Sequence, residues 1–161
     1  MASIAPARLA ELAKKSLRVP APGVGVAPRP RGLVNVAMWL WVDGFVPLSA
    51  TASVPGVSAT LTAVPARVHW DMGNGDTVTC AGPGKRFDFA AGVSVESARS
   101  GCSYTYRADS GGEPGKAFTV TATVTWRLTW ASNVGAAGDL GEVSASSTLT
   151  YPVDEIQTLS N

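Results

Sequence analysis

The stretch Val68–Cys80, VHWDMGNGDTVTC, decides the fold. Apolar and polar residues first alternate with a period of two, which predicts a strand with Trp70 on its buried face. Gly73 and Gly75 then supply positions that tolerate a positive φ, as a tight hairpin turn requires. The chain returns through Thr77–Cys80, where β-branched residues favour a second strand. The stretch therefore predicts a β-hairpin at the centre of the domain.

Three oxygen-bearing side chains, Asp71, Asn74 and Asp76, lie around this turn. Short carboxylates and amides commonly accept hydrogen bonds from turn amides. They are also calcium ligands, but calcium binds six to eight oxygens, so three in one hairpin make only a candidate site. We interpret the turn as a structural element and keep these three residues as candidate metal ligands. The structural turn residues are expected to be Trp70, Asp71, Gly73 and Gly75.

Outside the hairpin, further period-two patterns predict a protein made of strands. The chain has 161 residues, of which 45% are hydrophobic and only 16% are charged, as expected for one domain with its own core. The clearest strand is Phe118–Trp130, where apolar residues alternate with threonines. Other predicted strands cover residues 33–42, 46–54, 57–64, 102–107 and 143–153. Strands at this spacing indicate an all-β, two-sheet antiparallel sandwich.

The N-terminal part of the chain differs in composition from the rest. Pro6–Leu17 predicts a short amphipathic helix, and Val19–Arg31, VPAPGVGVAPRPR, predicts an extended Pro-rich linker. We expect a basic extension over residues 1–31, a β-sandwich over 32–154 and a tail over 155–161. The extension is a solvated segment or a contact to an anionic membrane or wall polymer. The net charge of +1 gives no field that would favour nucleic acid.

The hairpin and a later strand resemble a known family. Trp70–Gly75, WDMGNG, resembles the W-D-F-G-D-G signature of PKD domains, which are immunoglobulin-like β-sandwiches found mostly on extracellular proteins. Gly115–Thr125 resembles the family's G-x-Y-x-V-x-L-x-V-x run, and Tyr104–Tyr106 occupies the place of its H-x-Y element. The chain departs from the signature at Met72 and Asn74, where the family has an aromatic residue and Asp. The resemblance implies a PKD/immunoglobulin-like sandwich.

A closer similarity extends over nearly the whole chain. It resembles a family of uncharacterised actinobacterial exported PKD-like proteins, and the resemblance implies an exported protein without indicating an activity. The shared segments include residues 33–43 (LVNVAMWLWVD), 49–52 (SATA), 77–84 (TVTCAGPG), 102–106 (CSYTY) and 155–161 (EIQTLSN).

Cys80 and Cys102 are the only cysteines. In a β-rich chain they predict one disulfide, which the similarity to exported proteins favours over two buried free thiols. Such a bond persists in an oxidising compartment, so we expect a secreted or cell-surface protein. No apolar run reaches the roughly 18 residues needed to span a bilayer. Ala2–Leu17 lacks the apolar core of a signal peptide, which is expected of a mature form without its signal.

Residues with catalytic potential are few. His69 is the only histidine, so a triad would have to use it, and zinc binding by several histidines is excluded. Gly82–Lys85 lacks the spacing and the following Ser or Thr of a phosphate-binding loop. The acid pairs Asp109 with Glu113 and Asp139 with Glu142 fall in predicted loops. We therefore expect no enzymatic activity and no cofactor.

Trp39 and Trp41 are the candidate binding residues. They lie on one face of a predicted strand that is apolar on both faces. Exposed, they would stack on sugar rings or on a protein partner; core packing is the alternative. The first hypothesis is a non-enzymatic surface module for protein–protein interaction, adhesion or assembly, with homo-oligomerisation open. The second is a carbohydrate- or wall-binding module that uses these tryptophans or the 81–101 loop.

Overall fold

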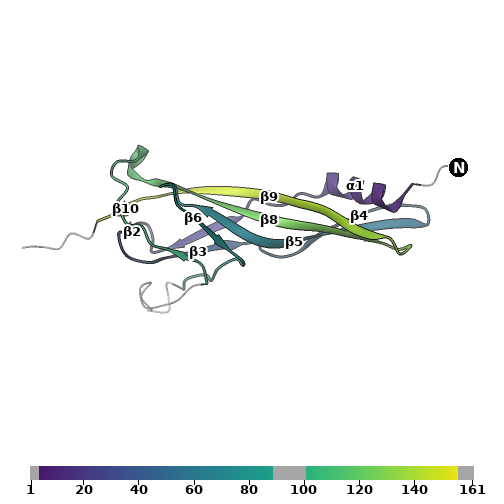
Figure 1. Ribbon diagram of the computed structural model, residues 1–161, viewed down its shortest axis with the longest axis horizontal. Helices are drawn as coiled ribbons and strands as arrows, with labels where there is room; N and C mark the ends of the chain where they lie inside the picture. Colours follow the sequence, from purple (N-terminus) through teal and green to yellow (C-terminus); the bar gives the residue numbers. More distant parts are fainter. Residues whose placement is uncertain (1–3, 89–100, 156–161) are drawn as a thin grey trace, which may run out of the picture.

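The computed structural model describes residues 4–88 and 101–155 of the chain (Figure 1). Strands dominate these residues, together with one α-helix and a short 3-10 turn. The all-β fold class is therefore confirmed, and the paired sheets are consistent with a sandwich. The elements are α1 (Pro6–Ser16), β1 (Gly23–Ala27), β2 (Gly32–Leu33), β3 (Met38–Asp43), β4 (Leu48–Val54), β5 (Val57–Asp71), β6 (Thr77–Cys80), β7 (Ser103–Tyr104), η2 (Pro114–Lys116), β8 (Phe118–Ser132), β9 (Ala137–Tyr151) and β10 (Val153–Asp154).

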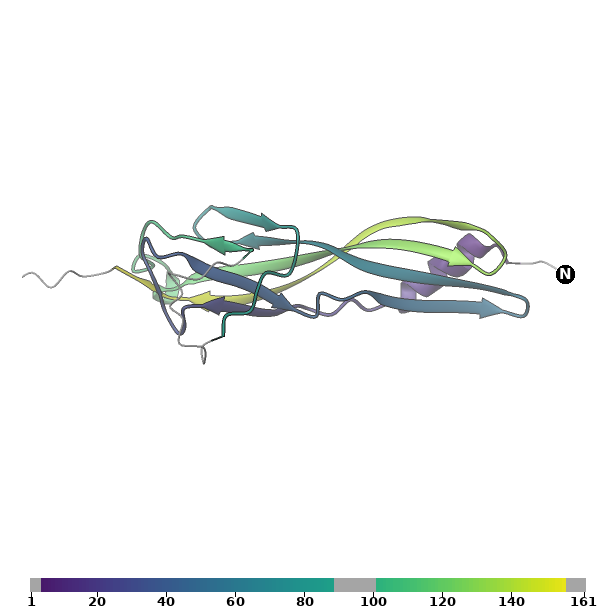
Figure 2. The same ribbon diagram turned by 90° about the horizontal axis from the view of Figure 1, so that it is seen from below.

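A long antiparallel sheet forms the body of the molecule. Its strand order is β4-β5-β8-β9, and β6 pairs with the other half of β5. Three of the strands have 15 residues each, which corresponds to about 50 Å at the usual rise of an extended chain. These lengths explain the elongated shape in Figures 1 and 2.

One face of the long sheet is apolar along its whole length. On β8, every second residue from Phe118 to Trp130 is buried. On β5, the buried residues change phase at a bulge between Pro65 and Arg67. Leu61 before the bulge and Val68 after it both pair with inward-facing residues of β8. The bulge therefore keeps both halves of β5 on the same apolar face.

Two different elements cover this inner face (Figures 1 and 2). A small antiparallel sheet of order β1-β3-β7 covers one half. Helix α1 contacts β4 and β5 in the other half, and its buried residues Leu9, Ala10 and Ala13 belong to the same core as Leu61. The opposite face of the long sheet carries mainly Thr and Ser side chains, such as Thr60, Thr129 and Ser146.

The N-terminal segment differs from the extended linker predicted for Val19–Arg31, because residues 23–27 form β1 and pair with all but the first residue of β3. One of the glycines in this segment is a packing requirement. Gly25 lies against the indole of Trp41, where a Cβ atom has no room. The strand predicted over 33–42 is also divided, since Asn35 adopts a φ of 67° between β2 and β3.

The remaining strand boundaries differ mainly in length. The strands predicted over 57–64 and from Val68 onwards are a single strand, β5, because the bulge allows the chain to continue. β9 begins at Ala137, earlier than the predicted start at 143, with a second register shift opposite Leu128 and Thr129. The strand predicted over 102–107 is limited to β7.

Burial of α1 predicts a clear contrast between two of its leucines. Leu9 is 1% exposed and Leu12 is 38% exposed. Replacing a buried Leu with Ala usually costs about 2–5 kcal/mol, so we expect Leu9→Ala to lower the free energy of unfolding by about that amount. Leu12→Ala, the matched control, should cost less than about 1 kcal/mol. Urea denaturation measures both; equal small effects would show that α1 does not stabilise the sheet.

Candidate functional site

Hydrogen bonds hold the central hairpin turn rigid. The carboxylate of Asp71 accepts a hydrogen bond from the backbone N–H of Gly73 at 2.9 Å. The amide oxygen of Asn74 accepts one from the N–H of Asp76 at 3.0 Å. Gly73 has a φ of 80° and lies against the backbone of Thr119, which leaves no space for a Cβ atom. The turn is therefore fixed by its own side chains and by close contact with β8.

Tyr104 completes this network from β7. Its hydroxyl donates to the carboxylate of Asp76 and accepts from the side-chain amide of Asn74 at 2.8 Å. Burial and the hydrogen bond to Asp76 raise the pKa of Tyr104. One side-chain oxygen of each of the three candidate metal ligands thus has a protein partner. Among residues 4–88 and 101–155, no cluster of three or more His, Cys, Asp or Glu side chains has the arrangement of a metal site.

Tyr106 connects the hairpin turn to the core. Its hydroxyl donates to the carbonyl oxygen of Met72 at 2.7 Å, and its ring stacks on Phe118 at a centroid distance of 4.5 Å. Tyr151, on β9, donates to the carbonyl of Pro28 at 2.6 Å. Burial raises the pKa values of Tyr106 and Tyr151. The sequence motif at residues 104–106 therefore has a structural role that the pattern alone did not indicate.

Trp39 and Trp41 are buried, with exposed fractions of 5% and 7%. They form a second small core with Ala27 and Phe87, and the Trp39 and Phe87 rings meet edge to face at 5.0 Å. Of the two alternatives for these tryptophans, an exposed aromatic row and core packing, the structure shows core packing. The physical reason is that β1 and the segment around Phe87 cover β3, and sequence reasoning had assigned both to irregular chain.

The start of the 81–101 loop runs alongside β3. The carbonyl of Pro83 accepts from the N–H of Val42 at 2.9 Å, and Gly84 lies against the carbonyl of Leu40 with no room for a side chain. The described residues up to 88 therefore act as part of the fold. Residues 89–100, which include most of the loop proposed for binding, lie outside the described residues.

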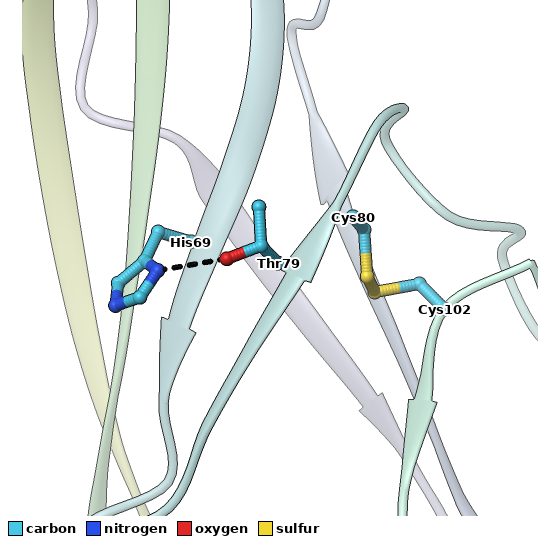
Figure 3. The surroundings of a disulfide bond; sticks show 4 residues. All are labelled: His69, Thr79, Cys80 and Cys102. Atoms are coloured by element: carbon cyan, nitrogen blue, oxygen red, sulfur yellow. Dashed lines mark hydrogen bonds between the residues drawn. A yellow bond between two sulfur atoms is a disulfide. The ribbon is translucent and has the colours of Figure 1, made fainter.

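The predicted disulfide is confirmed. Cys80 at the end of β6 is bonded to Cys102 beside β7, across a sequence separation of 22 residues. Figure 3 shows the bond next to His69 and Thr79. Because β6 belongs to the long sheet and β7 to the small sheet, the bond ties the two layers together.

His69 lies on the exposed side of β5. Its Nδ1 is 3.0 Å from the hydroxyl of Thr79 on the neighbouring strand (Figure 3). The acid pairs considered as catalytic have local roles as well, since Asp109 and Asp139 cap the N–H groups of Gly111 and Gly141. Glu142 forms an exposed ion pair with Arg67 that lowers the pKa of the carboxyl group.

A hollow of about 750 Å³ lies at the end of the molecule that carries β2 and β10. Its lining mixes both signs of charge and includes Arg31, Lys116, Asp109 and Asp154. Arg31 and Asp154 form an ion pair at 3.0 Å. Ser110, which is 2% exposed, fastens the hollow's wall by bonding the backbone of Val153 and the carbonyl of Lys116. Sequence reasoning missed this hollow because its residues come from separate loops.

Comparisons with known proteins add no assignment: no family model, no curated protein and no solved structure matches this chain. Among the described residues, no helix has the length and apolar character needed to cross a membrane.

Reduction of the disulfide should lower the melting temperature. A bond that closes a loop of this length stabilises a fold by roughly 3 kcal/mol in the chain-entropy model. For a domain of about 150 residues this corresponds to a decrease of roughly 6–12 °C. Differential scanning calorimetry with and without a phosphine reductant measures the change, and the Cys80→Ser, Cys102→Ser variant should be insensitive to the reductant. An unchanged melting temperature in the fully reduced protein would contradict a stabilising role.

The buried tyrosines should make the fold sensitive to alkali. Their pKa values are raised in the folded state above the unfolded value of about 10. Their contribution to stability is therefore complete below about pH 10 and is lost as the pH rises through the folded pKa values. We expect urea midpoints to fall between about pH 10 and pH 12. Tyr106→Phe and Tyr151→Phe should each show a shallower decline; an identical slope in both variants would overturn this assignment.

Proposed function

We propose that this chain is a non-enzymatic, PKD-like module of the extracellular space or cell surface that mediates protein–protein interaction in adhesion or surface assembly. The observation that carries the proposal is the Cys80–Cys102 disulfide between the two layers. A bond of this kind is retained in oxidising compartments and reduced in most cytoplasms. The WDMGNG turn and its resemblance to PKD domains give further support.

The surface available for binding supports a protein partner better than a sugar. The tryptophans that would stack on sugar rings are buried in the small core. The outer face of the long sheet instead carries hydroxyl groups, some of which bond each other, as Thr123 and Ser146 do at 2.7 Å. Long strands with free edges are the elements by which extended protein segments commonly bind.

Labelling of intact cells tests this proposal. The purified, disulfide-bonded protein, tagged with a fluorophore, is added to cells of the organism that encodes it. We expect surface labelling that is lost when the cells are first treated with trypsin and retained when soluble wall oligosaccharides are added in excess. Labelling that survives trypsin but is competed by the oligosaccharides would favour wall binding. An absence of surface labelling would contradict the proposal.

A variant control separates specific binding from adhesion of a misfolded protein. The Cys80→Ser, Cys102→Ser protein lacks the link between the layers and should label cells less as its folded fraction decreases. The Thr60→Lys variant, which changes an exposed residue on the outer face, should keep its fold. Equal labelling by unfolded and folded protein would show that the signal is non-specific.

A further inference from the structure

The edge of the long sheet at β9 is unusually open. Within the described residues, β8 is the only strand that pairs with β9. The other edge of β9 therefore presents backbone N–H and C=O groups over Val143–Tyr151 that no described strand bonds. The register between these residues and β8 is regular, since the bulge lies further along, opposite Leu128 and Thr129. Residues 143–151 of β9 thus offer a continuous template for another strand.

The sequence of this edge lacks the usual protection against pairing. Exposed edge strands commonly carry a lysine, a proline, an inward-pointing charge or a bulge. Residues 143–151, VSASSTLTY, contain none of these. Glu142, the nearest acid, lies just before the stretch and is held by Arg67. The absence of protective features over nine residues indicates that pairing is a function of this edge.

We propose that β9 pairs antiparallel with β9 of a second copy of this chain, so that the two long sheets join into one. This proposal rests on the proposed function of surface assembly and names the partner. Symmetric pairing about Ser147 uses the whole unprotected stretch. The stretch ends at Tyr151, because the carbonyl of the next residue, Pro152, already accepts a hydrogen bond from the N–H of Gly32.

In this register, the side chains of residues 143–151 in one copy are complementary to those of the same residues in the second copy. On the outer face, Ser144 would oppose Thr150 and Ser146 would oppose Thr148. These are hydroxyl pairs like the one that already joins β8 and β9 at Thr123 and Ser146. Ser and Thr pairs of this kind stabilise neighbouring strands.

The inner face of the stretch is complementary in the same way. Small and large residues would oppose each other there, with Ala145 against Leu149 and Val143 against Tyr151. Val143 and Leu149 are only partly buried in one copy, so pairing would remove further apolar surface from water.

Two copies can pair through their β9 edges more readily than through the opposite edge of the long sheet. That edge is divided between β4 and β6, which pair with different halves of β5. β4 has only seven residues, and Pro47 and Pro55 flank it. The β9 edge is longer and continuous, so a closed pair is favoured over an open chain of copies.

Analytical ultracentrifugation of the full chain, with lysine variants, tests the pairing. We expect a concentration-dependent monomer–dimer equilibrium up to about 100 μM. Ser146→Lys with Thr148→Lys places charges on the edge and should weaken association about tenfold or more. The control variant Thr60→Lys with Thr129→Lys adds the same charge to the same outer face, but on β5 and β8, which are not at an edge of the sheet. It should leave association unchanged. A monomer at all concentrations, equal effects of both variants, or assemblies larger than a dimer would overturn the proposal.

Cysteine cross-linking tests the register. The two native cysteines are bonded to each other, so a new thiol reports only its own neighbours. Directly opposed residues in an antiparallel pair have Cα atoms about 4.5–5.5 Å apart, within the range of a disulfide. Ser147→Cys should therefore form a covalent dimer under mild oxidation, and Ser146→Cys should do so less readily. Preferential cross-linking at position 146 would overturn the register.

The dimer and the surface function fail in distinguishable ways. A wild-type monomer that still labels cells in a trypsin-sensitive manner would overturn the pairing alone. A dimer that does not label cells would overturn the surface function alone. If the lysine edge variant loses binding to cells while the wild type is a monomer, the edge binds a strand of a different protein, and the second copy is excluded.

Discussion

The structure depends on one constraint: a sheet with strands of 15 residues must bury one apolar face along its entire length. β8 fixes this face, because its inward residues alternate without interruption from Phe118 to Trp130. The small sheet is too short to cover all of it, and α1 covers the remainder. The bulge on β5, the disulfide between the layers and the position of the N-terminal segment all follow from this requirement.

The strength of the local pattern determines how much of this fold the sequence predicts. β8 and the hairpin at residues 68–80 are predictable, because a period of two and a glycine turn are local signals. The disulfide is also predictable, since Cys80 and Cys102 have no other cysteine to pair with. β1 is not predictable in the same way. Its glycines read as linker, and only the indole of Trp41 on a strand distant in sequence explains Gly25.

The candidate sites also differ in whether their residues are predictable from local sequence or only from the tertiary structure. Residues that act within a turn, such as Asp71, are predictable from their spacing. Whether Trp39 and Trp41 are buried or exposed depends on which segments cover β3. Those segments are β1 and the residues near Phe87. An apolar strand face indicates burial, but it does not tell whether the cover comes from the same chain. The free edge at β9 is likewise a property of topology, which the alternation in 143–151 cannot show by itself.

The bulge between Pro65 and Arg67 has a consequence for dynamics. It divides β5 into a half covered by a single helix and a half clamped by the small sheet and the disulfide. α1 joins the rest of the fold through one irregular connection, residues 17–22. We therefore expect detachment of the helix to leave the clamped half intact. Amide protons of residues 57–64 should then exchange with solvent through a local opening, whereas those of 68–71 should exchange only on global unfolding. One continuous strand would thus belong to two cooperative units.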